Sequence, residues 1–555
     1  MGKNITVRCK NTGRSHKVPM GYNLEEVYEV LDLHMPYGAT SAKVNNKVEG
    51  LHYTLFSDKD IEYLDITSPS GLRTYTRSLF FVLYKAARDL YPGSRLRIET
   101  PVSNGYYCRL GLPGEKEVTE EVIAALRVRM HEIVDADLPF HRFTSPTEEA
   151  ARLFRENGLE SKAKLLEGLG SLYTTYYTLD GTPDYFYGSL LIKTSQLFLF
   201  DVVGYGDGLL LRLPDPADPS RLRPMVEQPK MFGVFSEQHR WNDILGVSTI
   251  GGLNAACDLG YTNDLINVSE ALQEKKISQI ADRIAARPEC RVILIAGPSS
   301  SGKTTFSKRL SVQLMACGVH PVPLSTDDYF VDREKTPLDE KGEYDFEHID
   351  ATNVPLLTRD IMTLIDGGEV EPPRFDFPTG KSMPSGRKLR LRPNEVLVIE
   401  GIHALNPRLT EGVPEERKFK IYASALTTIL LDDHNYIPTT DNRLLRRIVR
   451  DHKYRKRTAR ETIQQWPSVR RGEERWIFPY QEEADEMVNT ALLFELAALR
   501  DQALPLLEQV PESAPEYSEA YRLRKFLSYL KPISTVGLPP TSLLREFLGG
   551  STFKY

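Results

Sequence analysis

The stretch RVILIAGPSSSGKTTFSKRL, residues 291–310, decides the fold of the larger half of this chain. Residues 292–296 are apolar and β-branched, which is typical of a strand buried in a parallel sheet. Residues 297–304 match the pattern G-x-x-x-x-G-K-[ST], and a helix is expected directly after them. This order predicts a phosphate-binding loop, because backbone N–H groups and the helix N-terminus then face one anion.

Each position of this loop is a candidate nucleotide contact. Lys303 can bridge the β- and γ-phosphates of a nucleoside triphosphate, and the Thr304 hydroxyl can ligate Mg²⁺. The predicted ATP-binding set is Gly297, Pro298, Ser299, Ser300, Ser301, Gly302, Lys303, Thr304 and Thr305. The alternative is a Gly/Ser turn that matches by chance, which the flanking strand and helix disfavour.

Two carboxylates stand at the ends of other predicted strands. Asp327 follows the segment VPLST, where it can accept the proton of an acceptor hydroxyl. Glu400 ends the buried-strand pattern EVLVIE, where a carboxylate facing the loop can hold Mg²⁺ directly or through water. Either residue could instead cap a helix or turn.

Between Arg443 and Arg475 the sequence has twelve Lys/Arg and four acidic residues, a local charge of +8. Since the whole chain has a net charge of −6, the remainder has −14. A run of basic residues is usually a solvated helix face. In a chain that also has a phosphate-binding loop, this run favours a mobile lid that closes over the transferred phosphoryl group.

Length and composition indicate several ordinary globular domains. For 555 residues about three or four are expected. The overall charge shows no basic excess that would indicate nucleic-acid binding. Five scattered cysteines and the lack of a long apolar run predict a cytoplasmic protein without a membrane segment.

Secondary-structure patterns divide the chain into four parts. Residues 1–67 alternate short strands with one helix, as in a β-grasp module, and 68–267 form mixed α+β structure. Residues 268–500 alternate strand and helix, which predicts a doubly wound α/β domain with a parallel sheet. The segment 501–555 is a helical extension for which the sequence indicates no role.

Residues 291–496 resemble the uridine-cytidine kinase and phosphoribulokinase group of P-loop phosphotransferases. The resemblance rests on six collinear blocks: GPSSSGKT at 297, DDYF at 327, YDFEHIDAT at 344, RFDFPTGK at 374, VIEGIHAL at 398 and RLLRRIVRD at 443. It implies that Asp327 is the base for a nucleoside 5′-hydroxyl and that Thr304, Asp327 and Glu400 hold Mg²⁺. It also implies that Lys303 and Arg455 contact the phosphates.

The resemblance further implies an acceptor site. Its predicted residues are Glu347, Phe330, Phe375, Arg447, Arg457 and Gln465. Uridine kinases commonly read the base with a Tyr and a His, where this chain has Phe375 and Gly380. The loss of two polar contacts leaves the identity of the base open.

Residues 1–267 resemble the first two domains of threonyl-tRNA synthetase, a TGS module and an editing-type domain. This resemblance rests on two segments, TRSLFFVLYKAARDLYP from residue 76 and PVSNGYY from residue 101. Where the editing enzymes have a His-x-x-x-His pair, this chain has Arg77 and Phe81. The resemblance therefore implies a scaffold without editing activity.

Together these features predict a kinase that transfers phosphate from ATP to a nucleoside, most simply uridine or cytidine. Two other functions stay open: a kinase for another small alcohol, such as a pentose phosphate, pantothenate or a polyol, and an RNA-binding NTPase that uses the synthetase-like half. A catalytically inactive scaffold is disfavoured by the intact loop, Asp327 and Glu400. The oligomeric state is not predicted.

Overall fold

A five-stranded parallel sheet organises the half of the molecule that carries the loop. The computed structural model describes residues 3–340 and 342–554. The strand order is β16-β21-β15-β22-β23, and every neighbouring pair is parallel. The bounds are β15 (Val292–Ala296), β16 (His320–Ser325), β21 (Glu395–Glu400), β22 (Lys418–Ser424) and β23 (Glu486–Asn489). The predicted α/β class with a parallel sheet is confirmed for this half.

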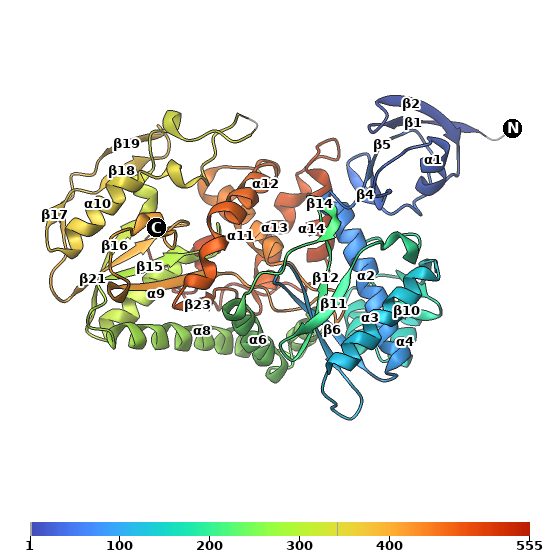
Figure 1. Cartoon of the computed structure of the whole chain (residues 1–555), viewed down its shortest axis with the longest axis horizontal. Helices are drawn as coiled ribbons and strands as arrows, with labels where there is room; N and C mark the ends of the chain where they lie inside the picture. Colours follow the sequence, from blue (N-terminus) through green and yellow to red (C-terminus); the bar gives the residue numbers. More distant parts are fainter. Residues whose placement is uncertain (1–2, 341, 555) are drawn as a thin grey trace.

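Helices pack around this sheet (Figure 1). They are α6 (Pro229–Ile244), α8 (Thr262–Ala285), α9 (Lys303–Ala316), α10 (Val354–Ile365), α11 (Thr439–Arg455), α12 (Ala459–Trp476) and α13 (Glu495–Glu508). Met231 and Phe235 of α6 are buried in the same hydrophobic cluster as Leu294 and Leu397 of the sheet. Although α6 lies outside the predicted range 268–500, its packing makes it part of this core.

Beside β16 and β21, two short strand pairs extend over residues 369–390. They are β17 (Glu369–Val370) with β20 (Leu389–Arg390), and β18 (Pro373–Asp376) with β19 (Lys381–Pro384). The β18–β19 hairpin carries one of the predicted acceptor-site residues, Phe375.

Residues 4–64 form a separate five-stranded sheet with one helix, at the opposite end of the molecule from β16 and β21 (Figure 1). Its order is β2-β1-β5-β3-β4. The elements are β1 (Asn4–Cys9), β2 (Arg14–Pro19), α1 (Leu24–Val30), β3 (Ser41–Val44), β4 (Lys47–Glu49) and β5 (Lys59–Leu64). A capping box between Asn23 and Glu26 starts α1, because each side chain accepts from the other's backbone N–H.

Between these two parts lies a mixed region built on the long buried helix α2 (Pro69–Leu90), which ends just before Pro92-Gly93 as the sequence predicts. A four-stranded sheet has the order β11-β12-β7-β6, a three-stranded sheet has the order β10-β9-β8, and β13 pairs with β14. The strands are β6 (Arg95–Val102), β7 (Gly105–Gly111), β8 (His141–Pro146), β9 (Tyr173–Leu179), β10 (Thr182–Asp184), β11 (Asp201–Tyr205), β12 (Gly208–Arg212), β13 (Pro214–Asp215) and β14 (Asp218–Leu222). The further helices are α3 (Glu120–Asp135), α4 (Thr147–Glu156), α5 (Glu160–Gly168) and α7 (Ile250–Asp258).

A buried ionic network joins this middle region to the sheet-bearing half. The ammonium of Lys162 lies 2.8 Å from Asp184 and 2.7 Å from Asp432, and the His434 ring lies 2.8 Å from Asp184. All four side chains are at most 2% exposed. Because a buried charge is tolerated only when it is paired, this network holds the two halves in one arrangement.

The C-terminal extension returns to the phosphate loop. It contains α14 (Tyr517–Leu527) and α15 (Arg545–Leu548). In Figure 1 α14 lies near the middle of the molecule. The helix α15 packs against α11, where the Phe547 ring lies against Arg446. Among the described residues, no helix is both long and apolar enough to cross a bilayer.

Candidate active site

The phosphate loop connects β15 to α9 in the expected conformation. A Cβ atom at Gly297 would lie 1.9 Å from the Ala423 carbonyl oxygen, so only glycine fits against β22. Gly302 has φ +81° and directly precedes α9, a left-handed conformation that glycine adopts without strain. The first N–H groups of α9 are thereby directed at the position where a phosphate would lie.

Lys303, Thr304 and Glu400 meet at the ends of β15 and β21. The Lys303 ammonium donates to the Pro298 carbonyl at 3.3 Å, so the loop itself satisfies it. The Thr304 hydroxyl is close enough to the Glu400 carboxylate to lower its pKa. Loss of water raises the pKa of Glu400 to about 7, with Asp327 and Glu546 adding to the rise and Lys303 opposing it.

Asp327 lies in the same group of charges. It is in the 3-10 turn Thr326–Tyr329 after β16, and its N–H donates to the Ser325 hydroxyl at 3.2 Å. Removal of water raises the pKa of Asp327, whereas the charges of Lys303 and Arg455 lower it. The structure therefore brings together Asp327 as the predicted base, Lys303 of the loop and Glu400 as a predicted metal ligand.

The first turns of α11 form a fixed wall behind the loop. Arg443 donates from Nε to the Ser299 carbonyl at 3.0 Å, and Arg447 donates to the Ser299 hydroxyl at 2.8 Å. Arg446 is fully buried and paired with Glu495. The lid interpretation of the whole range 443–475 is thus wrong for these arginines, because buried ion pairs and loop carbonyls hold them in place.

Two arginines at the end of α11, Arg450 and Arg455, lie near Asp327. Asp451 accepts ion pairs at 3.3 Å from Arg450 and at 3.3 Å from Arg455. Repulsion from Arg450 is the main cause that lowers the pKa of Arg455 to about 10, and loss of water is the second cause. Further along the chain, Arg457 donates to Gln465 on the exposed side of α12.

Glu347 is held between the loop region and α12. A Cβ atom at Gly472 would lie 2.2 Å from the Glu347 Cβ, so this glycine lets the helix approach. One carboxylate oxygen of Glu347 is buried without a hydrogen-bond partner among the described residues. Burial raises the pKa of Glu347 to about 7, while Arg447 lowers it and Glu473 raises it further.

The predicted aromatic residues form one cluster next to Asp328. The rings of Phe330 and Phe375 lie 5.5 Å apart, and Phe377, which sequence reasoning did not select, lies 5.1 Å from Phe375. Gly380 occupies the β18–β19 turn with φ +69°, and Arg333 packs against it and donates to the Phe377 carbonyl at 2.6 Å. This wall is apolar and has no polar side chain at position 375 or 380.

Two glutamates contact the loop without having been predicted to do so. Glu473 of α12 is fully buried, accepts from the Ser299 N–H at 3.1 Å and pairs with Arg443 and Arg470. Glu546 of α15 accepts from the Thr305 hydroxyl at 2.7 Å and from its N–H at 3.2 Å. In the sequence both are single acids among many, and only their tertiary contacts distinguish them.

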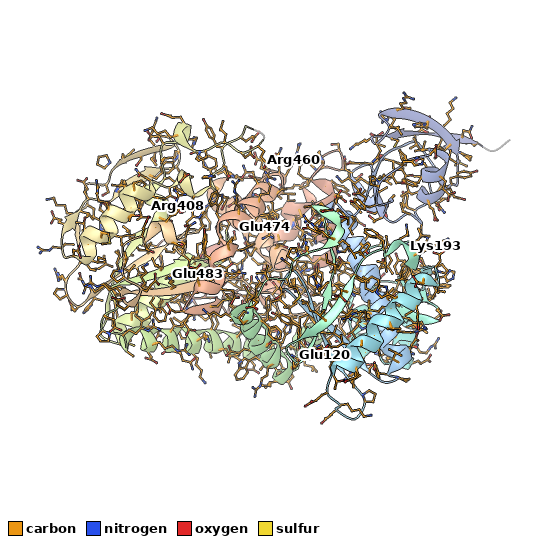
Figure 2. All side chains as sticks on the ribbon, viewed as in Figure 1. Glu120, Lys193, Arg408, Arg460, Glu474 and Glu483 are labelled. Atoms are coloured by element: carbon orange, nitrogen blue, oxygen red, sulfur yellow. The ribbon has the colours of Figure 1, made fainter. Side chains whose placement is uncertain are left out.

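The outer face of α12 differs from this buried side. Glu474 follows Glu473 directly but has a side chain that is 62% exposed, and Arg460 donates to Glu516 of the C-terminal extension at 3.1 Å (Figure 2). The helix thus joins the loop on one side and the extension on another.

In the synthetase-like region, Arg77 and Phe81, the residues expected at the positions of the editing histidines, have unrelated environments. Arg77 donates to the Ser189 carbonyl from Nε at 3.0 Å and from Nη2 at 2.9 Å. Phe81 is fully buried against Phe140 and Phe186. Neither side chain can transfer a proton or ligate a metal in the way that an imidazole does.

Comparison with known proteins supports the division into two halves. The N-terminal region is similar to threonine–tRNA ligases, with 32% identity over 152 residues to that of Rubrobacter xylanophilus. This match covers 27% of the chain and 23% of the ligase, so the chain spans about a quarter of the length of that relative. A D-glycerate 3-kinase from Cryptococcus neoformans is a structural neighbour with 12% identity and a TM-score of 0.22, covering 46% of this chain and 87% of that one.

The loop-bearing half has a clearer match. The uridine kinase of Ligilactobacillus salivarius is 30% identical over 180 residues, which cover 32% of this chain and 74% of that enzyme. Residues 292–492 match the family described as phosphoribulokinase / uridine kinase. These residues contain the loop, Asp327, Glu400 and the arginines of α11. Through its C-terminal half, the chain belongs to the phosphoribulokinase / uridine kinase family.

Proposed function

We propose that this protein transfers the γ-phosphoryl group of ATP to the 5′-hydroxyl of a nucleoside, uridine or cytidine. The observation that carries the proposal is the grouping of Asp327, Lys303 and Glu400 at the mouth of the phosphate loop. Membership of the family supports the use of ATP and a small-molecule acceptor.

In this proposal Asp327 accepts the proton of the acceptor hydroxyl as the new P–O bond forms. Lys303 leaves the Pro298 carbonyl and contacts the β- and γ-phosphates, and Arg455 neutralises charge on the transferred group. Glu347 binds the sugar hydroxyls through its unpartnered carboxylate oxygen. Arg447, Arg457 and Gln465 lie on the acceptor side, and Phe330 and Phe375 form the wall against the base.

The oxygen donors near the loop fit Mg²⁺. Thr304, Asp327 and Glu400 offer one hydroxyl and two carboxylates, a set that Mg²⁺ accepts while keeping several waters. Burial is the main cause of the raised pKa of Glu400, and a divalent cation here would offset the repulsion from Asp327 and Glu546 that adds to it. When bound, it supplies charge neutralisation at the β- and γ-phosphates. The protein itself offers few ligands for such an ion. Among the described residues, no three His, Cys, Asp or Glu side chains are grouped so that they could hold a metal ion.

The test is a panel of acceptors with ATP and Mg²⁺, followed by mass spectrometry of the product. The full chain is required, because α6 contributes Met231 and Phe235 to the kinase core and a fragment from residue 268 would lack them. Uridine or cytidine monophosphate is the expected product, and Lys303→Ala should abolish its formation.

Phosphorylation of only a pentose phosphate, pantothenate or a polyol would replace the nucleoside assignment. Hydrolysis stimulated by tRNA, without any acceptor, would instead support the RNA-binding NTPase.

A further inference from the structure

A cavity that the phosphate loop does not line lies between the synthetase-like half and the C-terminal extension. Its volume is about 470 Å³, which is within the range of small-molecule sites. Residues of β4, α2, β9 and α14 line it together with the segment 185–189. The wall includes Arg77 of α2.

The charge on this wall is strongly unbalanced. Six of the lining side chains are Lys or Arg, and only Glu49 is acidic. Three of the cations have acidic partners: Lys47 with Glu49 at 2.7 Å, Arg73 with Glu519 at 2.6 Å, and Arg522 with Asp441 at 2.8 Å.

The other three cations are Arg77, Arg142 and Lys525, and none of them forms an ion pair with an acid in the part of the chain that the structure describes. Arg77 and Lys525 donate only to neutral oxygens, among them the carbonyls of Ser189 and Tyr187. These charges also affect one another. Loss of water and the charges of Arg77, Lys47 and Arg142 lower the pKa of Lys525 to about 8, while the carboxylate of Glu49 opposes this shift. Crowded cations of this kind favour a bound anion that neutralises them.

The remaining wall is aromatic. Tyr187 and Tyr521 are half-buried, and Tyr173 is 65% exposed. The buried Nε2 of His52, on the same wall, lacks a hydrogen-bond partner among the described residues. An inorganic anion alone would leave most of the volume and these rings without contacts, whereas a phosphate ester that carries a planar ring would use both.

We infer that this cavity binds a mononucleotide, with its phosphate at Arg77, Arg142 and Lys525 and its base against the tyrosine rings. The site is separate from the acceptor site of the kinase half. One of its walls is α14, and Arg522 of this helix holds Asp441 at the start of α11. A bound mononucleotide would thus contact a helix that is joined to the wall of the phosphate loop.

Isothermal titration of the full chain tests this inference with UMP, AMP, ribose 5-phosphate, uridine and inorganic phosphate as probes. We expect UMP or AMP to bind more tightly than the other three. The double variant Arg142→Gln/Lys525→Gln removes two of the three phosphate-binding charges, and it should weaken this binding at least about tenfold because two charge-assisted contacts are lost. The matched control is Arg152→Gln, an exposed arginine of α4 outside the cavity, which should bind like the wild type.

Binding in the kinase site is distinguished by Lys303→Ala, which should leave the cavity titration unchanged. The inference is overturned if no mononucleotide binds, if Lys303→Ala rather than the double variant removes binding, or if Arg152→Gln weakens it equally. Equal affinity for ribose 5-phosphate would overturn the assignment of a base. Thermal unfolding of each variant shows whether a loss of binding reflects loss of folding, and in that case the single variant Arg142→Gln replaces the double one.

Discussion

The carboxylate of Glu546, in the C-terminal extension, lies 2.7 Å from the hydroxyl and 3.2 Å from the N–H of Thr305 in the phosphate loop. A carboxylate at this helix N-terminus uses a donor that the loop would otherwise direct at a phosphate. Leu543 of the same segment contacts Gly302, and Phe547 packs on Arg446. The C-terminal extension therefore packs directly against the phosphate loop.

Replacement of Glu546 should change the affinity for ATP. We expect Glu546→Gln to lower the KM for ATP by about threefold to tenfold, because the negative charge beside the phosphates is removed at the cost of one ordinary hydrogen bond. Steady-state kinetics with varied ATP measures this, with the exposed Glu411→Gln as control. A raised KM would show that the carboxylate supports the loop rather than competing with nucleotide.

Asp327 and its neighbour Asp328 provide an internal comparison for the proposed base. Asp327→Asn should lower kcat by roughly two orders of magnitude or more and leave ATP binding near normal, since only proton transfer is lost. Asp328→Asn should have a much smaller effect, because Asp328 faces Arg374 rather than Lys303. If Asp327→Asn keeps most of the turnover, another group accepts the proton.

Glu347 should make stability depend on pH. Folding raises its pKa from 4.5 to about 7, chiefly through burial, so the folded protein retains a proton that the unfolded chain releases between these values. Its contribution to the free energy of unfolding is fully present below about pH 4.5 and is lost as the pH rises through about 7.

The variant Glu347→Gln has no such proton. Its free energy of unfolding relative to the wild type should therefore increase as the pH rises across this interval. Urea unfolding without nucleotide at a series of pH values measures the difference. The exposed Glu474→Gln should show no such trend, and a flat difference for Glu347→Gln would contradict the assignment.

The buried pair of Arg443 and Glu473 should be important for the stability of the loop. Glu473→Leu leaves the Arg443 guanidinium buried and unpaired, which we expect to cost about 3–5 kcal/mol in the free energy of unfolding. The double variant Arg443→Met/Glu473→Leu should lose clearly less than the sum of the two single variants. Additive losses in urea unfolding would show that the two side chains do not depend on each other.

Local patterns were sufficient for the fold of the loop-bearing half. The apolar run 292–296 could only be a buried strand, and Gly297 and Gly302 lie where the backbone requires glycine. The basic run was more ambiguous, since a sequence does not tell a solvated arginine from a buried one. Arg443 and Arg446 are buried because Glu473 and Glu495 reach them from other helices, and such contacts leave no periodic signal.

The sequence by itself determined the phosphate loop, the parallel sheet and the family, because each depends on residue types at short and regular spacing. Only the tertiary structure decided that Glu546 reaches Thr305, that α6 belongs to the kinase core, and that Arg77 lines a cavity with Arg142 and Lys525. These contacts join residues tens to hundreds of positions apart. They depend on how separate hydrophobic faces pack, which no local pattern records.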